Sequence, residues 1–337
     1  MKNILVTGAT GFLGKKVSEE LVKSGYNVIG MGRNRKAGEY LVKKGIHFLE
    51  ADLRDEESII SSCKNIDCIV HSGALSSPWG KYKDFYDINV KGTEAILKGA
   101  KKHQVKKIIY VSSPSIYFDF TDKFNIKESD KLPLKFASYY SETKYLAEEV
   151  LDKASGSIDY ITIRPRAIYG IGDTTLFPRI ISANKKTGVP LINEGKQILD
   201  ITSVENVAHA IMLCMNVDSR ATGQKFNITD GEPMEFRSIL KMLFEGLETE
   251  LRVLNISYKT AYNLSYLMEL LSKYLLFGKE PLFTRYSLGV ISKSQTLDIS
   301  KARDILGYRP VISTSDSIKN VAGWWRANQN GRDGKGF

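Results

Sequence analysis

The chain has 337 residues, 42% of them hydrophobic and 26% charged, which is typical of a soluble globular protein with one large domain or two smaller ones. Its net charge of +10 is spread as lysine pairs over many predicted helical faces, with no basic run that alternates with aromatic residues, so a solvated surface is favoured over a nucleic-acid partner. It has no long apolar run and only three cysteines, which argues against a transmembrane span, a disulfide framework and a metal site.

The first predicted elements are a strand over 3–7 and a helix over 15–24, joined by a glycine-rich turn. Gly8 permits a tight turn, Gly11 lets the backbone approach a phosphate, and Gly14 lets strand and helix pack closely. The unpaired N–H groups at the start of the helix attract an anion. The segment therefore predicts a dinucleotide pyrophosphate site, with contacts from Gly8, Thr10, Gly11, Phe12, Leu13 and Gly14.

Strand and helix patterns alternate through the first half of the chain. Apolar strands separated by helices predict an α/β fold of the Rossmann type, a doubly wound parallel sheet with helices on both faces. After Pro165 the pattern changes, without a linker, to loops and short elements. We expect a dinucleotide-binding domain that carries the catalytic residues over 1–164. A smaller lobe over 165–330 would mainly bind substrate and be interleaved with late elements of the sheet. The strands are expected at 28–31, 46–50, 68–71, 107–111 and 160–163, and the helices near 55–62, 84–102 and 138–154.

The residues after the second strand bear on the choice of dinucleotide. A site for NAD places an acidic residue there, on the ribose 2′-hydroxyl, whereas this chain has Arg33, followed by Arg35 and Lys36. A solvated basic loop is the alternative interpretation. An arginine can bind a 2′-phosphate through two hydrogen bonds, so NADP is favoured over NAD. Arg33 is the first candidate for this contact, with Arg35 or Lys36 assisting.

The ends of the third and fourth strands complete the predicted cofactor site. Asp52, which Leu53 follows, can accept a hydrogen bond from the adenine amino group. After the fourth strand, Gly73 and Ala74 form a small-residue turn that allows the cofactor to approach. His71 at the end of that strand is interpreted as a packed residue and not as an acid or base.

Three residues after the fifth strand suit the reduction of a ketone. Tyr140 and Lys144 lie four apart, hence on one face of a helix, and Ser113 ends the preceding strand. A tyrosine can donate a proton to the carbonyl oxygen, an ammonium nearby is expected to lower the tyrosine pKa, and a serine hydroxyl can polarise the same oxygen. Tyr40 and Lys44 have the same spacing but lie on a predicted surface helix. Open parallel sheets bind ligands at the carboxyl ends of their strands, which favours Tyr140 and Lys144.

Together these motifs resemble the extended short-chain dehydrogenase/reductases, the NAD-dependent epimerase/dehydratase family, over essentially the whole chain. The resemblance implies that Tyr140 is the acid/base, that Lys144 activates it and binds the ribose, and that Ser113 polarises the carbonyl. It also implies that Pro165 borders the nicotinamide and that Asn89 kinks a helix and supports the site. The segments that carry it are 7–14, 52–53, 89–93, 111–113, 140–144, 164–170 and 306–310.

Within that family the chain looks like the 3β-hydroxysteroid dehydrogenase-like enzymes and the bacterial 2-alkyl-3-oxoalkanoate reductases. The segment 77–80, the doubled Tyr139-Tyr140, the segment 288–290 and Asp298 carry this likeness. Pro114 is a departure, since many relatives have a small residue there. Two alternatives stay open: a sugar-nucleotide epimerase or dehydratase with tightly bound NAD(P), and a non-catalytic redox sensor that binds NADP.

Residues 254–291 are rich in large apolar side chains. Packing of an amphipathic helix against the core explains many of them, but the apolar stripe is wider than one buried face requires. A cap over a hydrophobic substrate and a peripheral membrane contact are the alternatives. The residues are Tyr262, Leu264, Tyr266, Leu267, Met268, Leu270, Leu271, Tyr274, Leu275, Leu276, Phe277, Leu282 and Phe283.

The expected partner is a hydrophobic small molecule with a carbonyl group. The first strand begins directly after the first residues and leaves no room for a signal peptide, so a cytoplasmic location is expected. The resemblance also implies a homodimer, in which the helices near 84–102 and 138–154 pair across a two-fold axis.

Overall fold

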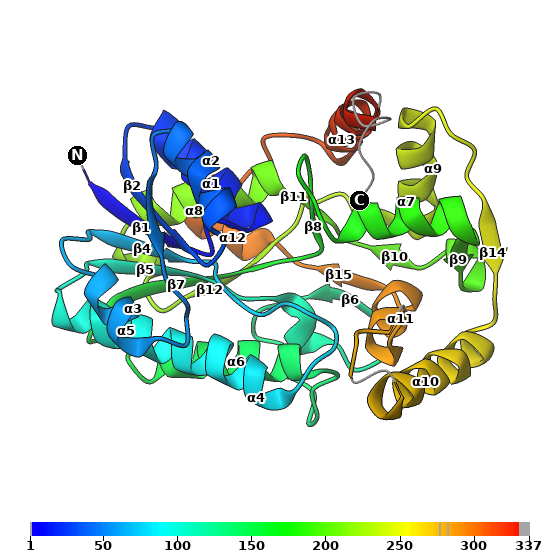
Figure 1. The fold of residues 1–337 in the computed structure, drawn as a ribbon, viewed down its shortest axis with the longest axis horizontal. Coiled ribbons are helices and arrows are strands. Elements are labelled where there is room, and N and C mark those ends of the chain that lie inside the picture. The colour runs from blue at the N-terminus through cyan, green and yellow to red at the C-terminus, as the bar shows by residue number, and fades with distance from the viewer. Residues whose placement is uncertain (1, 276–277, 282, 330–337) are drawn as a thin grey trace.

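The computed structural model describes residues 2–275, 278–281 and 283–329, and its largest element is a parallel sheet of seven strands in the order β12-β7-β5-β4-β1-β2-β3 (Figure 1). The sheet is the predicted Rossmann-type sheet, and each strand expected from the sequence is present within a residue or two. Its last strand comes from beyond residue 165. The strands are β1 (Asn3–Thr7), β2 (Asn27–Gly32), β3 (His47–Glu50), β4 (Cys68–His71), β5 (Lys107–Val111), β7 (Asp159–Pro165) and β12 (Lys225–Ile228).

Helices cover both faces of this sheet (Figure 1). On one face lie α1 (Phe12–Lys23), α2 (Arg35–Lys43), α8 (Val204–Asn216) and α12 (Ser300–Leu306). On the other lie α3 (Glu56–Ser62), α5 (Gly92–Lys102) and α6 (Tyr139–Asp152). The expected helix near 84–102 is interrupted, because α4 (Tyr82–Phe85) leads into a π-helical segment (Tyr86–Lys91) before α5 begins. The chain thus returns to the sheet with β12, α8 and α12 after it has entered the second lobe.

The second lobe consists of short strands and five helices within the described residues. A small sheet has the order β13-β10-β15-β6, and two further pairs join β8 to β11 and β9 to β14. The strands are β6 (Lys123–Ile126), β8 (Ile168–Tyr169), β9 (Val189–Leu191), β10 (Ile198–Leu199), β11 (Thr202–Ser203), β13 (Met234–Glu235), β14 (Val253–Asn255) and β15 (Gln295–Leu297). The helices are α7 (Leu176–Lys186), α9 (Phe236–Gly246), α10 (Tyr258–Tyr274), α11 (Arg285–Ser292) and α13 (Thr314–Gln329).

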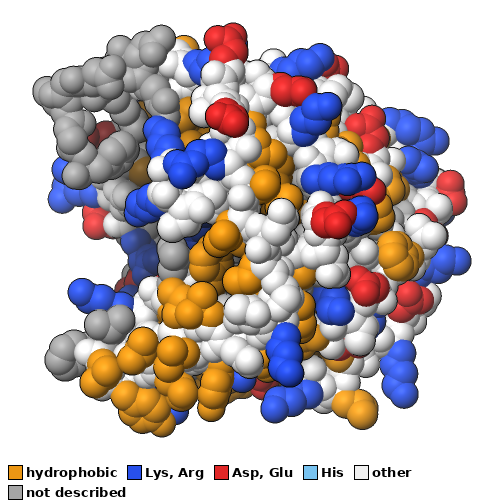
Figure 2. All heavy atoms as spheres, turned by 90° about the vertical axis from the view of Figure 1, so that its right-hand side faces the viewer, with side chains coloured by type: hydrophobic (Ala, Val, Ile, Leu, Met, Phe, Trp, Pro, Cys, Tyr) orange, Lys and Arg blue, Asp and Glu red, His pale blue; other side chains and the backbone are white. Residues whose placement is uncertain are grey.

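Helix α10 carries its apolar residues on the outside. Its buried residues are small or polar: Ala261, Ser265, Glu269 and Ser272. Hydrophobic side chains gather along the lower edge of this end of the molecule (Figure 2). Core packing, the simplest interpretation of the sequence, is therefore wrong for the outer residues, which are Leu264, Tyr266, Leu267, Leu271, Tyr274 and Leu275, between 41% and 71% exposed. Leu276, Phe277 and Leu282 lie outside the described residues.

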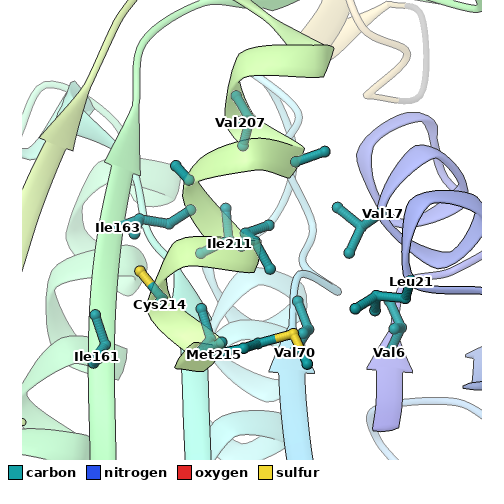
Figure 3. Close-up of a cluster of buried hydrophobic side chains, with 14 of the residues drawn as sticks. Val6, Val17, Leu21, Val70, Ile161, Ile163, Val207, Ile211, Cys214 and Met215 are labelled. Atoms are coloured by element: carbon teal, nitrogen blue, oxygen red, sulfur yellow. The ribbon is translucent and has the colours of Figure 1, made fainter. Parts of the chain in front are cut away.

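The main core lies between the sheet and α1 and α8. Val6 and Val70 from the strands meet Val17 and Leu21 of α1, and Ile211 of α8 fills the space between them (Figure 3). These side chains are at most 1% exposed. Burying each such aliphatic side chain contributes about 1.5–3 kcal/mol, so the turn between β1 and α1 rests on a firmly packed support. No helix in the described part of the chain is long and apolar enough to cross a membrane.

Candidate active site

The turn after β1 brings three backbone segments into close contact. Gly8 has a φ of +71°, and a Cβ atom there would lie 2.7 Å from the Cα of Gly73 in the loop after β4. A Cβ on Gly14 would lie 2.2 Å from the carbonyl oxygen of Gly8. Only glycine fits these positions, since real Cβ atoms do not approach so closely. The absence of side chains leaves the backbone of the turn bare at the carboxyl end of β1.

Helix α1 begins at this turn without a side-chain cap, as far as the described residues show. Gly11 is its N-cap residue and provides no side-chain hydrogen bond to the first N–H groups. Such groups and the positive end of the helix dipole suit a pyrophosphate. Phe12 stands beside this site, with its ring 3.4 Å from a Cβ built on Gly170, and Leu13 packs on the core. The cradle therefore fits the dinucleotide expected from the sequence.

A cluster of charged residues lies at the ends of β2 and β3, where we expect the adenosine half of the dinucleotide. Arg33 places a guanidinium nitrogen 3.6 Å from the carboxylate of Asp52, and Arg54 binds the same carboxylate through two nitrogens, at 3.0 and 2.6 Å. Hydrogen bonds from Arg54 outweigh partial burial and lower the pKa of Asp52 to about 2. Asp52 is thus bound to arginine before any ligand arrives. Arg33 is the more loosely held of the two guanidiniums.

Thr10 and Leu53 are the other predicted residues in this region. The Thr10 side chain lies against Gly32 at the end of β2, where a Cβ would be 2.4 Å from its hydroxyl. Leu53 lies between Gly73 and Gly92, within 3.1 Å of a Cβ built on either. Arg54 was missed by sequence reasoning. Its position two residues after an acidic strand end was the signal that could have found it.

Asn89 anchors the loop that carries Gly73 and Ala74. Its amide accepts from the N–H of Leu75 at 2.7 Å, donates to the Leu75 carbonyl at 3.1 Å, and donates to the hydroxyl of Thr143 on α6 at 3.0 Å. The π-helical segment places this buried side chain between the loop and α6. His71 is 1% exposed and hydrogen-bonded to Thr7 and Thr93, so it is the packed residue that was expected.

Ser113, Tyr140 and Lys144 lie together at the carboxyl end of β5. Ser113 is half-buried and caps a 3₁₀ turn over Pro114–Tyr117, where a proline suits the first position because its missing N–H would be unpaired. Burial raises the pKa of Tyr140 to about 12, while a hydrogen bond with Ser113 lowers it. The serine and tyrosine hydroxyls thus converge on one point, as the sequence predicts. Pro165 ends the neighbouring strand β7 and is buried.

Lys144 is held by the backbone of β5. Its ammonium donates to the carbonyl oxygen of Val111 at 2.6 Å and lies 4.1 Å from the centre of the Tyr110 ring. Burial lowers the pKa of Lys144 to about 7, against an opposing effect of Glu148. The expected lowering of the Tyr140 pKa by Lys144 is therefore wrong for the chain alone. Burial dominates at the tyrosine, and the lysine is itself only partly charged at neutral pH.

A buried ion pair fixes α6 against the sheet. Arg164 at the end of β7 binds Glu148 of α6 through two nitrogens, at 2.9 and 2.5 Å, and the two side chains are 3% and 0% exposed. Arg164 also donates to the hydroxyl of Tyr117. Glu148 lies one helical turn after Lys144, so the ion pair fixes the position of the α6 face that carries Tyr140 and Lys144 relative to β5 and β7.

Helix α11 brings a residue that the sequence analysis missed, Tyr286. A Cβ on Gly289 would lie 2.7 Å from the ring of Phe120, so the glycine lets α11 pack closely on the segment 118–120. Tyr286 is then placed with its ring centre 6.1 Å from that of Phe118 and with its phenol beside Ser138 and Ser141, at the start of α6. Its phenol also lies near that of Tyr140. Gly289 lies in the 288–290 segment noted above and was the available signal.

An apolar cavity opens from this side. It has a volume of about 450 Å³ and is lined by Phe120, Tyr258, Lys259 and Tyr262. Phe120 contacts Phe118, with ring centres 5.0 Å apart, and Phe118 contacts Tyr286. A row of aromatic side chains therefore leads from the cavity to Tyr286, whose phenol lies beside the start of α6.

Comparison with known proteins gives matches over most of the chain. Residues 5–257 match the 3-beta hydroxysteroid dehydrogenase/isomerase family. The uncharacterized protein YbjS of Escherichia coli is 34% identical, with 96% of this chain and 97% of that protein covered. A 2-alkyl-3-oxoalkanoate reductase of Stenotrophomonas maltophilia is 28% identical, with 94% and 98% covered.

Among solved structures, the UDP-glucuronic acid 4-epimerase of Bacillus cereus in complex with NAD has a similar fold. Its TM-score is 0.78 at 20% identity, and the likeness covers 98% of this chain and 99% of that one. At this level of identity the likeness concerns the fold alone. It agrees with the predicted doubly wound sheet.

Proposed function

The chain belongs to the 3-beta hydroxysteroid dehydrogenase/isomerase family, a branch of the extended short-chain dehydrogenase/reductases, and from this premise we propose that it reduces a ketone of an apolar substrate with NADPH. As a member it is an NAD(P)-dependent oxidoreductase. The convergence of the Ser113 and Tyr140 hydroxyls at the carboxyl end of β5 is the observation that carries the proposal. When bound, the nicotinamide supplies or accepts the hydride at the substrate carbon.

The side chains of this site divide the remaining chemistry. Tyr140 donates a proton to the carbonyl oxygen, and Ser113 hydrogen-bonds to the same oxygen and polarises it. Lys144 lies one helical turn after Tyr140 on the same face of α6. In this position we expect it to bind the ribose and to compensate negative charge on the tyrosine. Because the ammonium already rests on the Val111 carbonyl, it is positioned before the cofactor arrives. Asn89 and the Glu148–Arg164 pair position these groups and take no part in proton transfer.

The preference for NADPH rests on the basic cluster around Asp52. Arg33 is 62% exposed and its guanidinium has only a loose contact with the carboxylate, so it is free to bind a 2′-phosphate. A charge-assisted contact of this kind contributes about 1.5–3 kcal/mol, which corresponds to a factor of about 10 to 100 in affinity. Arg33→Ala should remove most of the preference for NADPH over NADH, as measured by fluorescence titration. Equal affinity of the unmodified protein for both cofactors would contradict the assignment.

An apolar substrate is supported by the cavity next to the site. Its aromatic lining and the row through Phe118 to Tyr286 suit a hydrocarbon chain or ring system better than a sugar nucleotide. The relative from Stenotrophomonas is named for a 2-alkyl-3-oxoalkanoate, a ketone with apolar chains. Tyr258 and Tyr262 of α10 line this cavity, which supports the cap over a substrate as our interpretation of this segment.

The outer side of α10 suits a lipid surface. Its exposed leucines and tyrosines are accompanied by Lys273 and, five residues after the helix, by Lys279, and the single acid of this helix, Glu269, is turned inwards to Arg285. An apolar strip flanked by lysines binds at the interface of an anionic membrane. We propose a peripheral contact of this kind, which would give the enzyme access to a substrate dissolved in lipid.

The test of the main proposal is a panel of ketones with NADPH, followed by the absorbance of the reduced cofactor. Medium-chain 3-oxoacyl compounds and 3-ketosteroids should be reduced, and nucleotide sugars should not. A sugar-nucleotide epimerase would instead retain its dinucleotide through purification, so heat-denatured protein would release about one equivalent of it. A redox sensor would bind NADPH and turn over none of the panel. Either of these last two results would overturn the proposal.

A homodimer is part of the same proposal. Tyr139 is 51% and Tyr82 is 37% exposed on the outer side of α6 and α4, with ring centres 5.3 Å apart, and Leu146 and Val150 continue this face along α6. Such a half-exposed apolar face on paired helices suits a four-helix interface. Light scattering at micromolar concentration should give twice the mass of the chain, and a monomer mass would contradict it.

A further inference from the structure

Arg166 is a buried cation for which the described part of the chain provides no direct partner. It follows β7 by one residue and is 6% exposed, and its Nε has no hydrogen-bond partner. None of the ion pairs found among the described residues includes it. Two residues earlier, Arg164 is equally buried but is bound to Glu148 and Tyr117. The contrast is informative, because an unpaired charge in the interior costs several kcal/mol and is seldom kept without a purpose.

The position of Arg166 connects it to the active site. Burial lowers its pKa to about 10, against an opposing effect of the Asp200 carboxylate, so it remains a cation at neutral pH. The phenol of Tyr286 lies near Arg166 and beside Ser138 and Ser141, at the start of α6. Arg166 also directly follows Pro165, which ends β7 next to β5 and its Ser113. The unpaired guanidinium therefore belongs to the same site as the catalytic hydroxyls, on the side of α11.

Asp200 is the other candidate for a partner, and it is already engaged. Its carboxylate accepts a hydrogen bond from the N–H of Leu297 at 2.7 Å and is 2% exposed. Burial raises its pKa to about 6. Asp200 thus compensates part of the field of Arg166 from a distance without filling its hydrogen-bonding positions.

We propose that Arg166 binds a carboxylate of the substrate, placed close to the carbonyl that Tyr140 protonates. This inference rests on the proposed reductase function and adds the group that the site recognises. The planar guanidinium matches a carboxylate with two parallel hydrogen bonds, and a buried site strengthens them. The hydrocarbon part of the substrate would extend past Tyr286 and Phe118 into the cavity under α10.

A neutral analogue of the same shape should bind poorly. It would leave the guanidinium buried and unpaired, and sites built for a polar group discriminate strongly against ligands that lack it. Octanoate and octanamide form such a matched pair. With NADP⁺ bound to the protein, isothermal titration calorimetry should give at least about 10-fold tighter binding of octanoate, the lower end expected for a charge-assisted contact.

Arg166→Met should remove this discrimination, with a loss of about 10- to 100-fold for octanoate and little change for octanamide. Arg285→Met is the control, because Arg285 also lies beside Tyr286 but is paired with Glu269 at the surface, and it should retain the discrimination. Turnover of a 2-alkyl-3-oxo acid against its methyl ester should follow the same pattern in kcat/KM. Arg166→Lys, which keeps the charge without the planar fork, should fall between the two.

Three results would overturn the inference. Equal binding of octanoate and octanamide to the unmodified protein would do so without any variant that has to fold. Weaker binding of NADPH itself to Arg166→Met would make the residue a cofactor ligand. Restored stability in the double variant Arg166→Met with Asp200→Asn, with unchanged octanoate discrimination, would make it a structural counterion. Reduction of neutral 2-nonanone tests the proposed function separately, since that function can hold while the carboxylate site fails.

Discussion

Helices α6 and α10 both turn polar side chains inwards, but they are attached to the molecule in different ways. In α6 the buried set includes Ala147 and Leu151, which join a core cluster with α3, α5 and the sheet, and its ion pair with Arg164 is closed to water. In α10 only Ala261 is a buried hydrophobic residue, and its Glu269–Arg285 pair is partly open, with the arginine 39% exposed. The helix with the proposed proton donor is therefore rigidly fixed, whereas the helix over the cavity rests on few apolar contacts.

The difference suits the two tasks. Proton transfer requires hydroxyls held within a fraction of an ångström, and a substrate of variable shape requires walls that can adjust. Three sets of substitutions can break or sharpen this comparison, and they differ in the size of effect that we expect.

The largest effect is expected from the two tyrosines. Tyr140→Phe on α6 deletes the proton donor and should lower kcat by about 10²- to 10⁴-fold, with NADPH affinity nearly unchanged. Tyr286→Phe on α11 should mainly raise KM, by less than about 10-fold, because it removes one hydroxyl at the edge of the substrate site. Steady-state kinetics with one ketone measures both. Tyr40→Phe is the control, since that hydroxyl only donates to Glu19 at the surface. A kcat loss at Tyr286 equal to that at Tyr140 would place chemistry on the adjustable side.

The two ion pairs should differ in their contribution to the free energy of unfolding. Arg164→Met leaves Glu148 buried and should cost about 3 kcal/mol, the lower end for such a group, because Lys225 lies 3.6 Å away and compensates partly. Arg285→Met should cost less, because this arginine is 39% exposed and the backbone N–H of residue 285 still bonds to the Glu269 carboxylate in the variant. Urea unfolding of the two variants measures the difference. Equal costs would mean that α10 and α11 are as firmly fixed as α6.

The contribution of the Arg164–Glu148 pair to the free energy of unfolding depends on pH with a definite sign. Burial acts to raise the pKa of Glu148, but Arg164 outweighs it, and the pKa lies below its ordinary value. The stabilisation is therefore complete above the pKa of an unfolded glutamate, about 4.3, and is lost as the pH falls through the lower value of the folded chain. Arg164→Met should remove this part of the acid sensitivity.

The smallest effect on stability is expected on the outer face of α10. Leu267→Ser with Leu271→Ser changes residues that are 51% and 41% exposed, and should alter the free energy of unfolding by no more than about 0.5 kcal/mol per site. The unmodified protein should sediment with vesicles that contain phosphatidylglycerol, and the double variant should not. A large drop in melting temperature would return this face to the core. Equal sedimentation of both proteins would contradict the lipid contact.

The sequence predicted the sheet and the cofactor cradle well, because both depend on local signals. Alternating apolar strands and helices indicate a doubly wound sheet, and a glycine needed for a positive φ or a close approach, such as Gly8 or Gly14, is visible in the sequence itself. The common face of Tyr140 and Lys144 on α6 could be predicted because it depends on one helical turn. These features depend on few long-range contacts.

The rest depended on contacts between distant segments. Tyr286 meets Ser138 across about half of the chain, and only Gly289, three residues further along α11, indicates the close packing that brings them together. The isolation of Arg166 is visible only once Asp200 is seen to be engaged by Leu297. For α10, the apolar period indicates a helix with one apolar face, but it does not tell whether that face is turned towards the core or towards the outside.

The buried Lys144 has a consequence for the protein before any ligand binds. Its pKa is about 7 in the folded chain, whereas a lysine in an unfolded chain keeps its proton up to about pH 10.4. Between these values unfolding must take up a proton, so the proton acts as a ligand of the unfolded state and a rising pH stabilises the fold. This dependence runs through a different pH range from that of Glu148. In so far as Lys144 decides it, the free enzyme resists unfolding better in mildly alkaline solution than at neutrality.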